Sequence, residues 1–154
     1  MKLFVVAVGH RMPAWVDAGF AEYAARMPRE MRVELVALKP AQRSGGAKRA
    51  VDEEGQRMVA AIPAGCVTVA MDERGEALST AELARHLVRW RQGGQNVAFL
   101  LGGADGLAQS VKNVSNAVWS LSGLTLPHGL ARVVLAEQLY RAASILHNHP
   151  YHRE

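Results

Sequence analysis

The chain has 154 residues, of which 49% are hydrophobic, and it carries a formal net charge of +4. This length predicts a single domain, residues 1–154, with enough apolar side chains for an ordinary packed core. No uncharged apolar stretch reaches the roughly 18 residues that a membrane-spanning helix needs, and the N-terminus lacks a signal-peptide pattern. We therefore expect a cytoplasmic protein with no membrane partner. Cys66 is the single cysteine, which excludes an intrachain disulfide.

The first third of the chain predicts two strands that flank a helix. Residues 2–9 are expected to form a strand, because residues 3–8 are a continuous apolar run that ends at Gly9, which is typical of a buried strand. A helix is expected to begin at Pro13, where proline's missing N–H is tolerated. Its buried face recurs at helical spacing and contains Val16, Phe20, Tyr23 and Met27. Residues 31–38 alternate between apolar and polar side chains and predict the second strand.

A basic segment follows, residues 39–49, with the sequence KPAQRSGGAKR. It has two glycines and no acidic residue, and its cations are Lys39, Arg43, Lys48 and Arg49. Two interpretations stay open. The segment is either a solvated linker between a strand and a helix, or an arm that contacts backbone phosphates, which need cations and tolerate flexibility.

The middle of the chain continues the alternation. A helix is expected over 48–62, a strand over 66–71 and a turn over 72–75. Ser79 and Glu82 have the spacing of a capping box, which predicts the start of another helix. That helix should bury three side chains and stop at a glycine pair; they are Leu83, Leu87 and Trp90, then Gly93 and Gly94. The alternation predicts an α/β fold, with a mainly parallel sheet and helices on both faces.

The last third contains the candidate ligand site. Residues 97–101 are a fully apolar run of strand length, and they lead directly into the glycine-rich loop 102–106. Ligands bind beyond the carboxyl ends of strands in open α/β sheets. No G-x-G-x-x-G follows the first strand and no phosphate-binding P-loop motif occurs, which argues against the common nucleotide folds. A second apolar run, 117–126, is interrupted by serines and a glycine and stops at Pro127.

A long helix is expected over residues 130–146, and the chain closes on a tail rich in histidine. Apolar side chains lie around much of the helix circumference, so the helix must be covered on most sides. A homodimer interface would supply that cover. The tail histidines are His147, His149 and His152, and their spacing matches no standard zinc signature. A metal site, a frayed terminus and a functional tail all remain open from the residues alone.

Several segments together resemble one family. LLGGADG, SLSGLTLPHGLARVVLAEQLYRA and NHPYHRE, with MKLFVVAVG and MPAWVDAGFAEYAARMP near the start, resemble the ribosomal RNA large subunit methyltransferase H family. The likeness covers all 154 residues without a large gap. Those enzymes belong to the SPOUT class, so the resemblance implies a C-terminal trefoil knot and a homodimer. It also implies S-adenosylmethionine as the methyl donor. The implied substrate is N3 of a pseudouridine in the helix 69 loop of 23S rRNA, within the assembled ribosome.

The resemblance also implies site residues. S-adenosylmethionine is expected among three segments, represented by Met71, by Gly102 and by Leu121, Ser122, Gly123, Leu124, Thr125 and Leu126. Loop backbone groups could bind the adenine edge while leucine and methionine side chains cover its faces. No metal is needed for methyl transfer from a sulfonium.

The acceptor nitrogen must lose its proton as the methyl group arrives. The candidate catalytic or substrate contacts are Arg141, Tyr151, His152 and Arg153, with the general base unassigned. An arginine could stabilise the developing enolate-like oxygen, and a histidine could take the proton. His128 is a weaker candidate, since it follows Pro127 and could simply shape the loop. The alternative functions are a catalytically inactive RNA-binding module of the same fold and a flavodoxin-like oxidoreductase.

Overall fold

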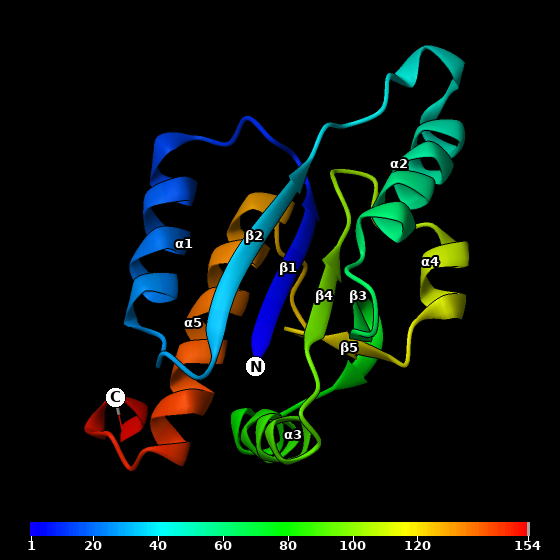
Figure 1. Ribbon diagram of the computed structural model, residues 1–154. Coiled ribbons are helices and arrows are strands. Elements are labelled where there is room, and N and C mark those ends of the chain that lie inside the picture. Colours follow the sequence, from blue (N-terminus) through cyan, green and yellow to red (C-terminus); the bar gives the residue numbers. More distant parts are fainter. Residues whose placement is uncertain (154) are drawn as a thin grey trace.

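A five-stranded, wholly parallel sheet with the strand order β2-β1-β4-β3-β5 forms the centre of the computed structural model, which describes residues 1–153 (Figure 1). The strands are β1 (Lys2–Val8), β2 (Arg32–Leu38), β3 (Val67–Ala77), β4 (Val97–Leu101) and β5 (Ala117–Ser120). The α-helices are α1 (Ala14–Arg26), α2 (Ala47–Ala61), α3 (Thr80–Gln92), α4 (Gln109–Val114) and α5 (His128–Leu146). Short 3-10 turns occupy Arg43–Gly45 and Pro150–Arg153.

Helices cover both faces of the sheet, which confirms the predicted α/β class. Alternate residues of β1 point to opposite faces, because the side-chain period of a strand is two. Leu3 and Val5 pack in the core beneath α1, α3 and α5, whereas Val6 and Val8 pack with residues of α2 and α4. All five residues of β4 are buried, as expected for a central parallel strand covered on both sides. The predicted trefoil knot stays a prediction.

The start of α3 lies where the capping box predicts it, and the start of α1 lies one residue later than expected. The capping box is formed, since Glu82 N donates to Ser79 Oγ (3.1 Å) and Ser79 N donates to Glu82 Oε2 (2.7 Å). The side chains predicted for the core side of α3, from Leu83 to Trp90, are buried. Pro13 precedes the first helical residue of α1 rather than occupying it.

The region after Met71 differs from the prediction. The expected turn over 72–75 is a wide bulge inside β3, because Met71 and Glu76 both pair with Trp119. A Cβ on Gly75 would lie 2.7 Å from the backbone carbon of Trp119, so the bulge closes tightly against β5. Pairing with a strand far along the sequence therefore overrides the local turn signal. The polar residues 72–75 follow Met71, the last residue of β3 that pairs with β4.

Two further segments were not predicted as observed. The short helix α4 has no side-chain cap and was missed. The apolar run 117–126 divides into the strand β5 and a loop, because the Ser120 hydroxyl turns the chain. It donates to the carbonyl oxygen of Ser122 (2.9 Å) and accepts from the Ser122 N–H (3.3 Å). The long C-terminal helix begins at His128, two residues earlier than expected.

Candidate functional site

A pocket of about 880 Å³ opens at the carboxyl ends of β3, β4 and β5. It lies where open parallel sheets place their ligands. Three stretches distant in sequence form most of its wall: residues 71–74, residues 101–107 and residues 120–128. Lys112 of α4 and Ala131 of α5 complete the lining.

The glycine loop after β4 is folded so closely that residue 102 cannot carry a side chain without a shift. A Cβ on Gly102 would lie 2.4 Å from both the carbonyl carbon and the carbonyl oxygen of Gly106. Gly106 N donates to the Gly103 carbonyl oxygen (3.1 Å) and has a φ of +84°, a conformation that favours glycine. The loop therefore presents bare backbone to the pocket.

The loop that follows β5 forms the opposite wall and is held by side-chain hydrogen bonds. Leu124 N donates to Ser122 Oγ (2.9 Å), and Thr125 Oγ1 donates to Glu73 Oε2 (2.6 Å). The second bond ties this loop to the bulge of β3. Leu124 leaves 79% of its surface exposed. An apolar side chain is thus available at the pocket mouth for contact with a ligand.

Charged groups of the β3 bulge and α4 line the same pocket. Lys112 Nζ lies 2.5 Å from Asp72 Oδ2, and Arg74 N donates to Asp72 Oδ1 (2.8 Å). Burial acts to raise the pKa of Asp72, but the Lys112 ammonium and the Arg74 N–H outweigh it and lower that pKa overall. At the mouth, Asp105 of the glycine loop forms an ion pair with Arg43 of the basic segment.

A buried arginine lies beside the pocket at the end of β1. Arg132 is 1% exposed, and its Nη2 donates to the carbonyl oxygens of Val8 (3.3 Å) and Gly9 (2.9 Å). Burial lowers its pKa, partly opposed by Asp17. Its position anchors the first turns of α5, and with them the pocket-lining His128, to the central sheet.

The structure brings together nearly all of the residues predicted for the cofactor. The pocket lining includes Met71, Gly102, Leu121, Ser122, Leu124, Thr125 and Leu126, and omits only Gly123 from the predicted set. Sequence reasoning missed Asp72, Glu73 and Lys112. Two adjacent acids immediately after a buried strand were the available signal for the first two. No local pattern marked Lys112.

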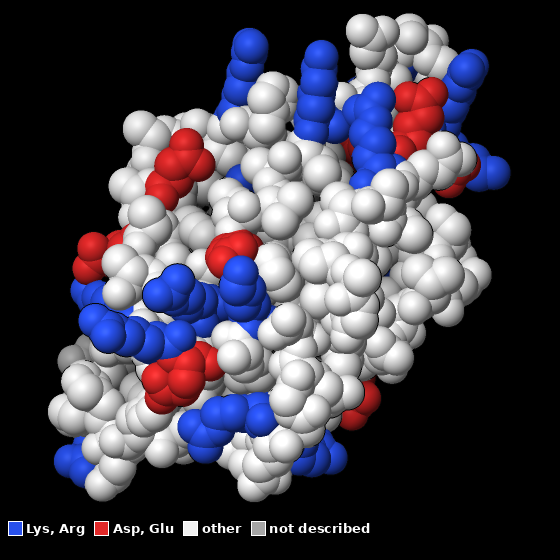
Figure 2. All heavy atoms as spheres, viewed as in Figure 1, with Lys and Arg blue, Asp and Glu red and all other residues white. Residues whose placement is uncertain are grey.

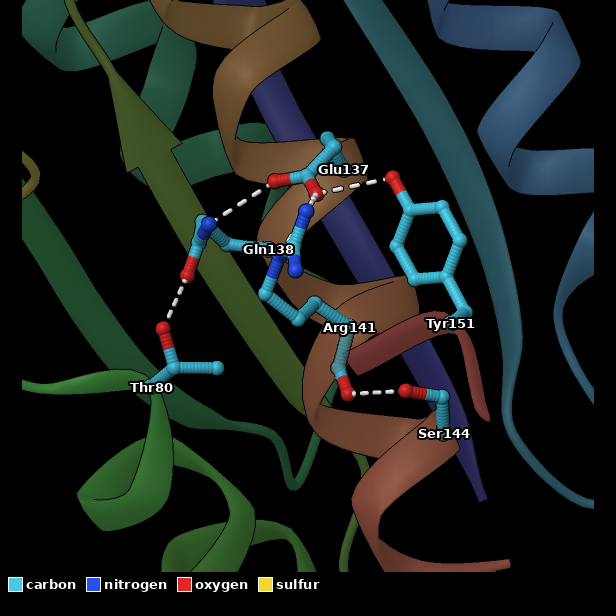
Figure 3. Close-up of polar contacts among 6 residues, drawn as sticks. All are labelled: Thr80, Glu137, Gln138, Arg141, Ser144 and Tyr151. Atoms are coloured by element: carbon cyan, nitrogen blue, oxygen red, sulfur yellow. Dashed lines mark hydrogen bonds and ion pairs between the residues drawn. The ribbon is translucent and has the colours of Figure 1, made fainter. Parts of the chain in front are cut away.

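Two of the predicted catalytic residues, Arg141 and Tyr151, meet at a carboxylate of α5 (Figure 3). Glu137 Oε1 accepts from Arg141 Nε (2.8 Å) and from the Tyr151 hydroxyl (2.9 Å), and the Arg141 guanidinium lies 4.8 Å from the centre of the Tyr151 ring. Gln138 extends the network from Glu137 Oε2 (2.8 Å) to the hydroxyl of Thr80 (2.6 Å). We name Glu137, Arg141 and Tyr151 the Glu137 cluster.

The cluster holds Tyr151 as a proton donor. Burial, together with the hydrogen bond to Glu137 and the nearness of Tyr23, raises the pKa of Tyr151 above its ordinary value. His152 is partly buried, and within residues 1–153 its Nδ1 atom is enclosed without a hydrogen-bond partner. Arg153 is exposed, while Glu154, which ends the YHRE motif, lies outside the described residues.

Within one chain the catalytic candidates do not reach the pocket. His128 lines the pocket and Arg141 lies on the same helix more than three turns later, roughly 20 Å along its axis. His147, just after α5, contacts Glu30 (3.1 Å), which precedes the start of β2. The helix therefore runs from the edge where strands end to the edge where they begin (Figure 1).

The tail histidines have separate surroundings. His149 Nδ1 accepts from the Tyr151 N–H (3.2 Å), while His147 contacts Glu30. Among residues 1–153, no three His, Cys, Asp or Glu side chains are grouped so as to hold a metal ion. In the same range, no helix combines the length and apolar character needed to cross a membrane.

Comparison with known proteins gives consistent matches over the whole chain. A family model described as "Predicted SPOUT methyltransferase" matches residues 1–152. Proteins named ribosomal RNA large subunit methyltransferase H are 54% identical in Ralstonia pickettii and 56% identical in Ralstonia nicotianae, in each case over 99% of both chains.

Solved structures show the same fold at low sequence identity. A protein assigned to the methylase family from Haemophilus influenzae is 11% identical with a TM-score of 0.54, covering 97% of this chain and 69% of its own. Another from Neisseria gonorrhoeae is 12% identical with a TM-score of 0.52, covering 90% and 81%.

Proposed function

The chain belongs to the SPOUT methyltransferases and, within them, to the family of ribosomal RNA large subunit methyltransferase H. From that premise we propose that it transfers a methyl group from S-adenosylmethionine to N3 of a pseudouridine in the helix 69 loop of 23S rRNA. We place this reaction on the assembled ribosome, in the cytoplasm. The observation that carries the proposal is the pocket, because segments 71–74, 101–107 and 120–128 converge there.

The pocket's chemistry suits that cofactor. The glycine loop brings backbone close to the pocket, where groups other than the paired Gly106 N–H can bind the adenine edge, while Leu124 and Met71 offer apolar contacts to its faces. Asp72, which is paired with Lys112, and Glu73 place carboxylate oxygens in the wall of a pocket proposed to hold a sulfonium and an ammonium. We propose the same role for Leu121, Ser122, Gly123, Thr125 and Leu126. When bound, the cofactor supplies an electrophilic methyl group.

The chain's own residues must orient the acceptor and manage its proton. The N3–carbon bond forms as the carbon–sulfur bond breaks, the sulfonium becomes a thioether, and the N3 proton leaves. We propose that Arg141 and Arg153 stabilise the negative charge that develops on the neighbouring carbonyl oxygen. Tyr151, whose hydroxyl donates to Glu137, would act by holding the carboxylate that positions Arg141. His152 is then the better candidate for the proton acceptor.

These roles require two copies of the chain. Because α5 places Arg141 roughly 20 Å along its axis from the pocket-lining His128, a homodimer would bring one chain's tail to its partner's pocket. Exposed apolar surface supports such an interface: Trp15 of α1 is 58% exposed and Ile145 of α5 is 36% exposed. These helices pack side by side on one face of the sheet.

The decisive experiment offers labelled S-adenosylmethionine with assembled ribosomes, isolated large subunits or naked 23S rRNA. We expect label in RNA from assembled ribosomes, and its loss with Arg153→Ala. If none of the three accepts label although the cofactor binds, the substrate is wrong. If neither label nor cofactor binding is found, the chain is a binding module of the same fold and the enzymatic proposal fails.

A further inference from the structure

An exposed basic edge lies next to the pocket and has no part in the chemistry proposed above. It consists of Lys39, Arg43, Lys48 and Arg49 from the segment 39–49, all of them exposed. The hydrogen bond from Gly9 N to the Leu38 carbonyl oxygen (2.7 Å) joins the ends of β1 and β2, and the exposed Arg11 follows Gly9 by two residues at this same edge of the sheet. Figure 2 shows lysine and arginine side chains projecting from this upper edge, over the end of β2 and the start of α2.

The segment is anchored at its base. Ala41 N donates to Glu54 Oε2 (3.0 Å), and Glu54 is only 9% exposed. Arg57 Nη1 donates to the Lys39 carbonyl oxygen (2.9 Å). Because α2 fixes the backbone in this way, the cations project from a defined surface. Glu54 is occupied by the backbone and does not cover their charge, whereas Arg49 Nε lies 3.6 Å from Glu53 Oε1 in an exposed pair one turn along α2. Such an exposed pair is weak and leaves Arg49 able to contact another anion.

The tip of the segment contacts the glycine loop. Arg43 Nη2 pairs with Asp105 Oδ2, and their side chains are 58% and 32% exposed. Asp105 also lines the pocket. An exposed ion pair of this kind is weak and screened by salt. A phosphodiester group can replace the carboxylate, because a guanidinium binds both anions through the same paired N–H groups.

We propose that residues 39–49, with Arg11, form the surface that binds the phosphodiester backbone of the RNA substrate, and that Arg43 exchanges Asp105 for a phosphate when the RNA docks. This inference rests on the proposed function and names the surface that serves it. The exchange links RNA docking to the glycine loop of the cofactor pocket. Phosphate contacts position a substrate without reading its sequence, and no base recognition is assigned to this edge.

The test measures binding of fluorescently labelled protein to purified ribosomes at fixed magnesium, from about 50 to about 200 mM KCl. Lys48→Gln/Arg49→Gln should weaken binding and flatten the plot of log affinity against log salt by roughly 0.7–0.9 per lost cation. Arg91→Gln is the matched control, since Arg91 is exposed on α3 and lies before the start of β4, at the opposite edge. It should leave the slope unchanged.

The proposed exchange at Arg43 predicts opposite changes in ribosome affinity when either partner of the ion pair is replaced. Arg43→Gln should weaken ribosome binding, whereas Asp105→Asn should strengthen it by up to about fivefold, the scale of one surface ion pair. Asp52→Asn on α2 makes the same charge change without freeing Arg43 and should have a smaller effect. If the ion pair only shaped the loop, Arg43→Gln and Asp105→Asn would change ribosome affinity in the same direction.

The outcomes separate this inference from the function on which it rests. If the unmodified protein fails to methylate ribosomes, the proposed function is wrong. If it methylates them but Lys48→Gln/Arg49→Gln keeps the original salt slope, the basic edge does not bind RNA. An Asp105→Asn variant that binds more weakly, or no more tightly than Asp52→Asn, would overturn the exchange. Unchanged thermal unfolding of each variant confirms that folding is intact.

Discussion

Gly102→Ala tests the proposed cofactor loop with the smallest change available. The added Cβ would lie 2.4 Å from two backbone atoms of Gly106 and 2.8 Å from Leu107 N, so backbone must move. Gly102 does not have a positive φ, which means that alanine tolerates its backbone conformation and the contact alone carries the effect. Overpacking of this kind typically destabilises a protein by about 1–3 kcal/mol.

Two measurements follow from that contact. Replacing glycine also restricts the unfolded chain, which offsets this destabilisation by about 0.4–1 kcal/mol. A net loss of about 1–2 kcal/mol lowers Tm by roughly 2–8 °C for a chain of this length. Displacing the loop also removes its backbone hydrogen bonds to the ligand. We expect titration calorimetry to show S-adenosylmethionine binding weakened by at least about tenfold, or about 1.4 kcal/mol.

Gly123→Ala is the matched control, because Gly123 belongs to the same predicted cofactor set. A Cβ there would meet nothing within 4 Å, and its φ is not positive. Its Tm should be unchanged or slightly raised. If Gly102→Ala kept both its Tm and its affinity, the tight packing of the glycine loop would be refuted. Equal losses in the two variants would show that backbone crowding is not the cause.

Three further predictions concern charged groups. Folding lowers the pKa of Asp72, so the ionised carboxylate stabilises the fold fully above its ordinary pKa of 3.8, and this stabilisation is lost as the pH falls through the lowered pKa. In Asp72→Asn, the free energy of unfolding should therefore fall less between about pH 5 and about pH 2. Arg132→Met leaves two carbonyl oxygens at the end of β1 without their donor, so urea unfolding should show a free energy of unfolding lower by about 1–3 kcal/mol. A more stable variant would mean that burying the guanidinium costs more free energy than its hydrogen bonds contribute. Glu137→Gln releases Arg141 and Tyr151, so kcat should fall at least about tenfold. Cofactor affinity, measured by calorimetry, should stay unchanged because Glu137 does not line the pocket, and weakened cofactor binding would contradict this separation.

The sequence predicted the elements whose signals are local. The strands β1 and β4 follow from continuous apolar runs, and α3 follows from its capping box, because hydrophobic period and caps act within a few residues. The bulge of β3 could not be predicted in this way. It exists because Met71 and Glu76 pair with the same residue of β5, and that pairing joins segments more than forty residues apart in sequence.

The residues of the candidate site also separate into those with a local sequence signal and those that depend on distant pairing. Glycines at a strand end are visible in sequence, so the loop at Gly102 was found. Asp72 and Glu73 were assigned to a turn, and their place in the pocket depends on the bulge. The ion pair between Arg43 and Asp105 joins two loops from different parts of the chain and has no signature in either one.

The separation between pocket and tail, by contrast, follows from the sequence once α5 is accepted as a helix. A rigid helix with a rise of about 1.5 Å per residue fixes the distance between His128 and Arg141 whatever else the fold does. Side chains of ordinary length cannot close such a gap. If the tail and the pocket take part in one reaction, they come from two copies of the chain. We infer that activity then depends on assembly, so dilution below the dimer dissociation constant should abolish methyl transfer while each pocket still binds cofactor through its own loops.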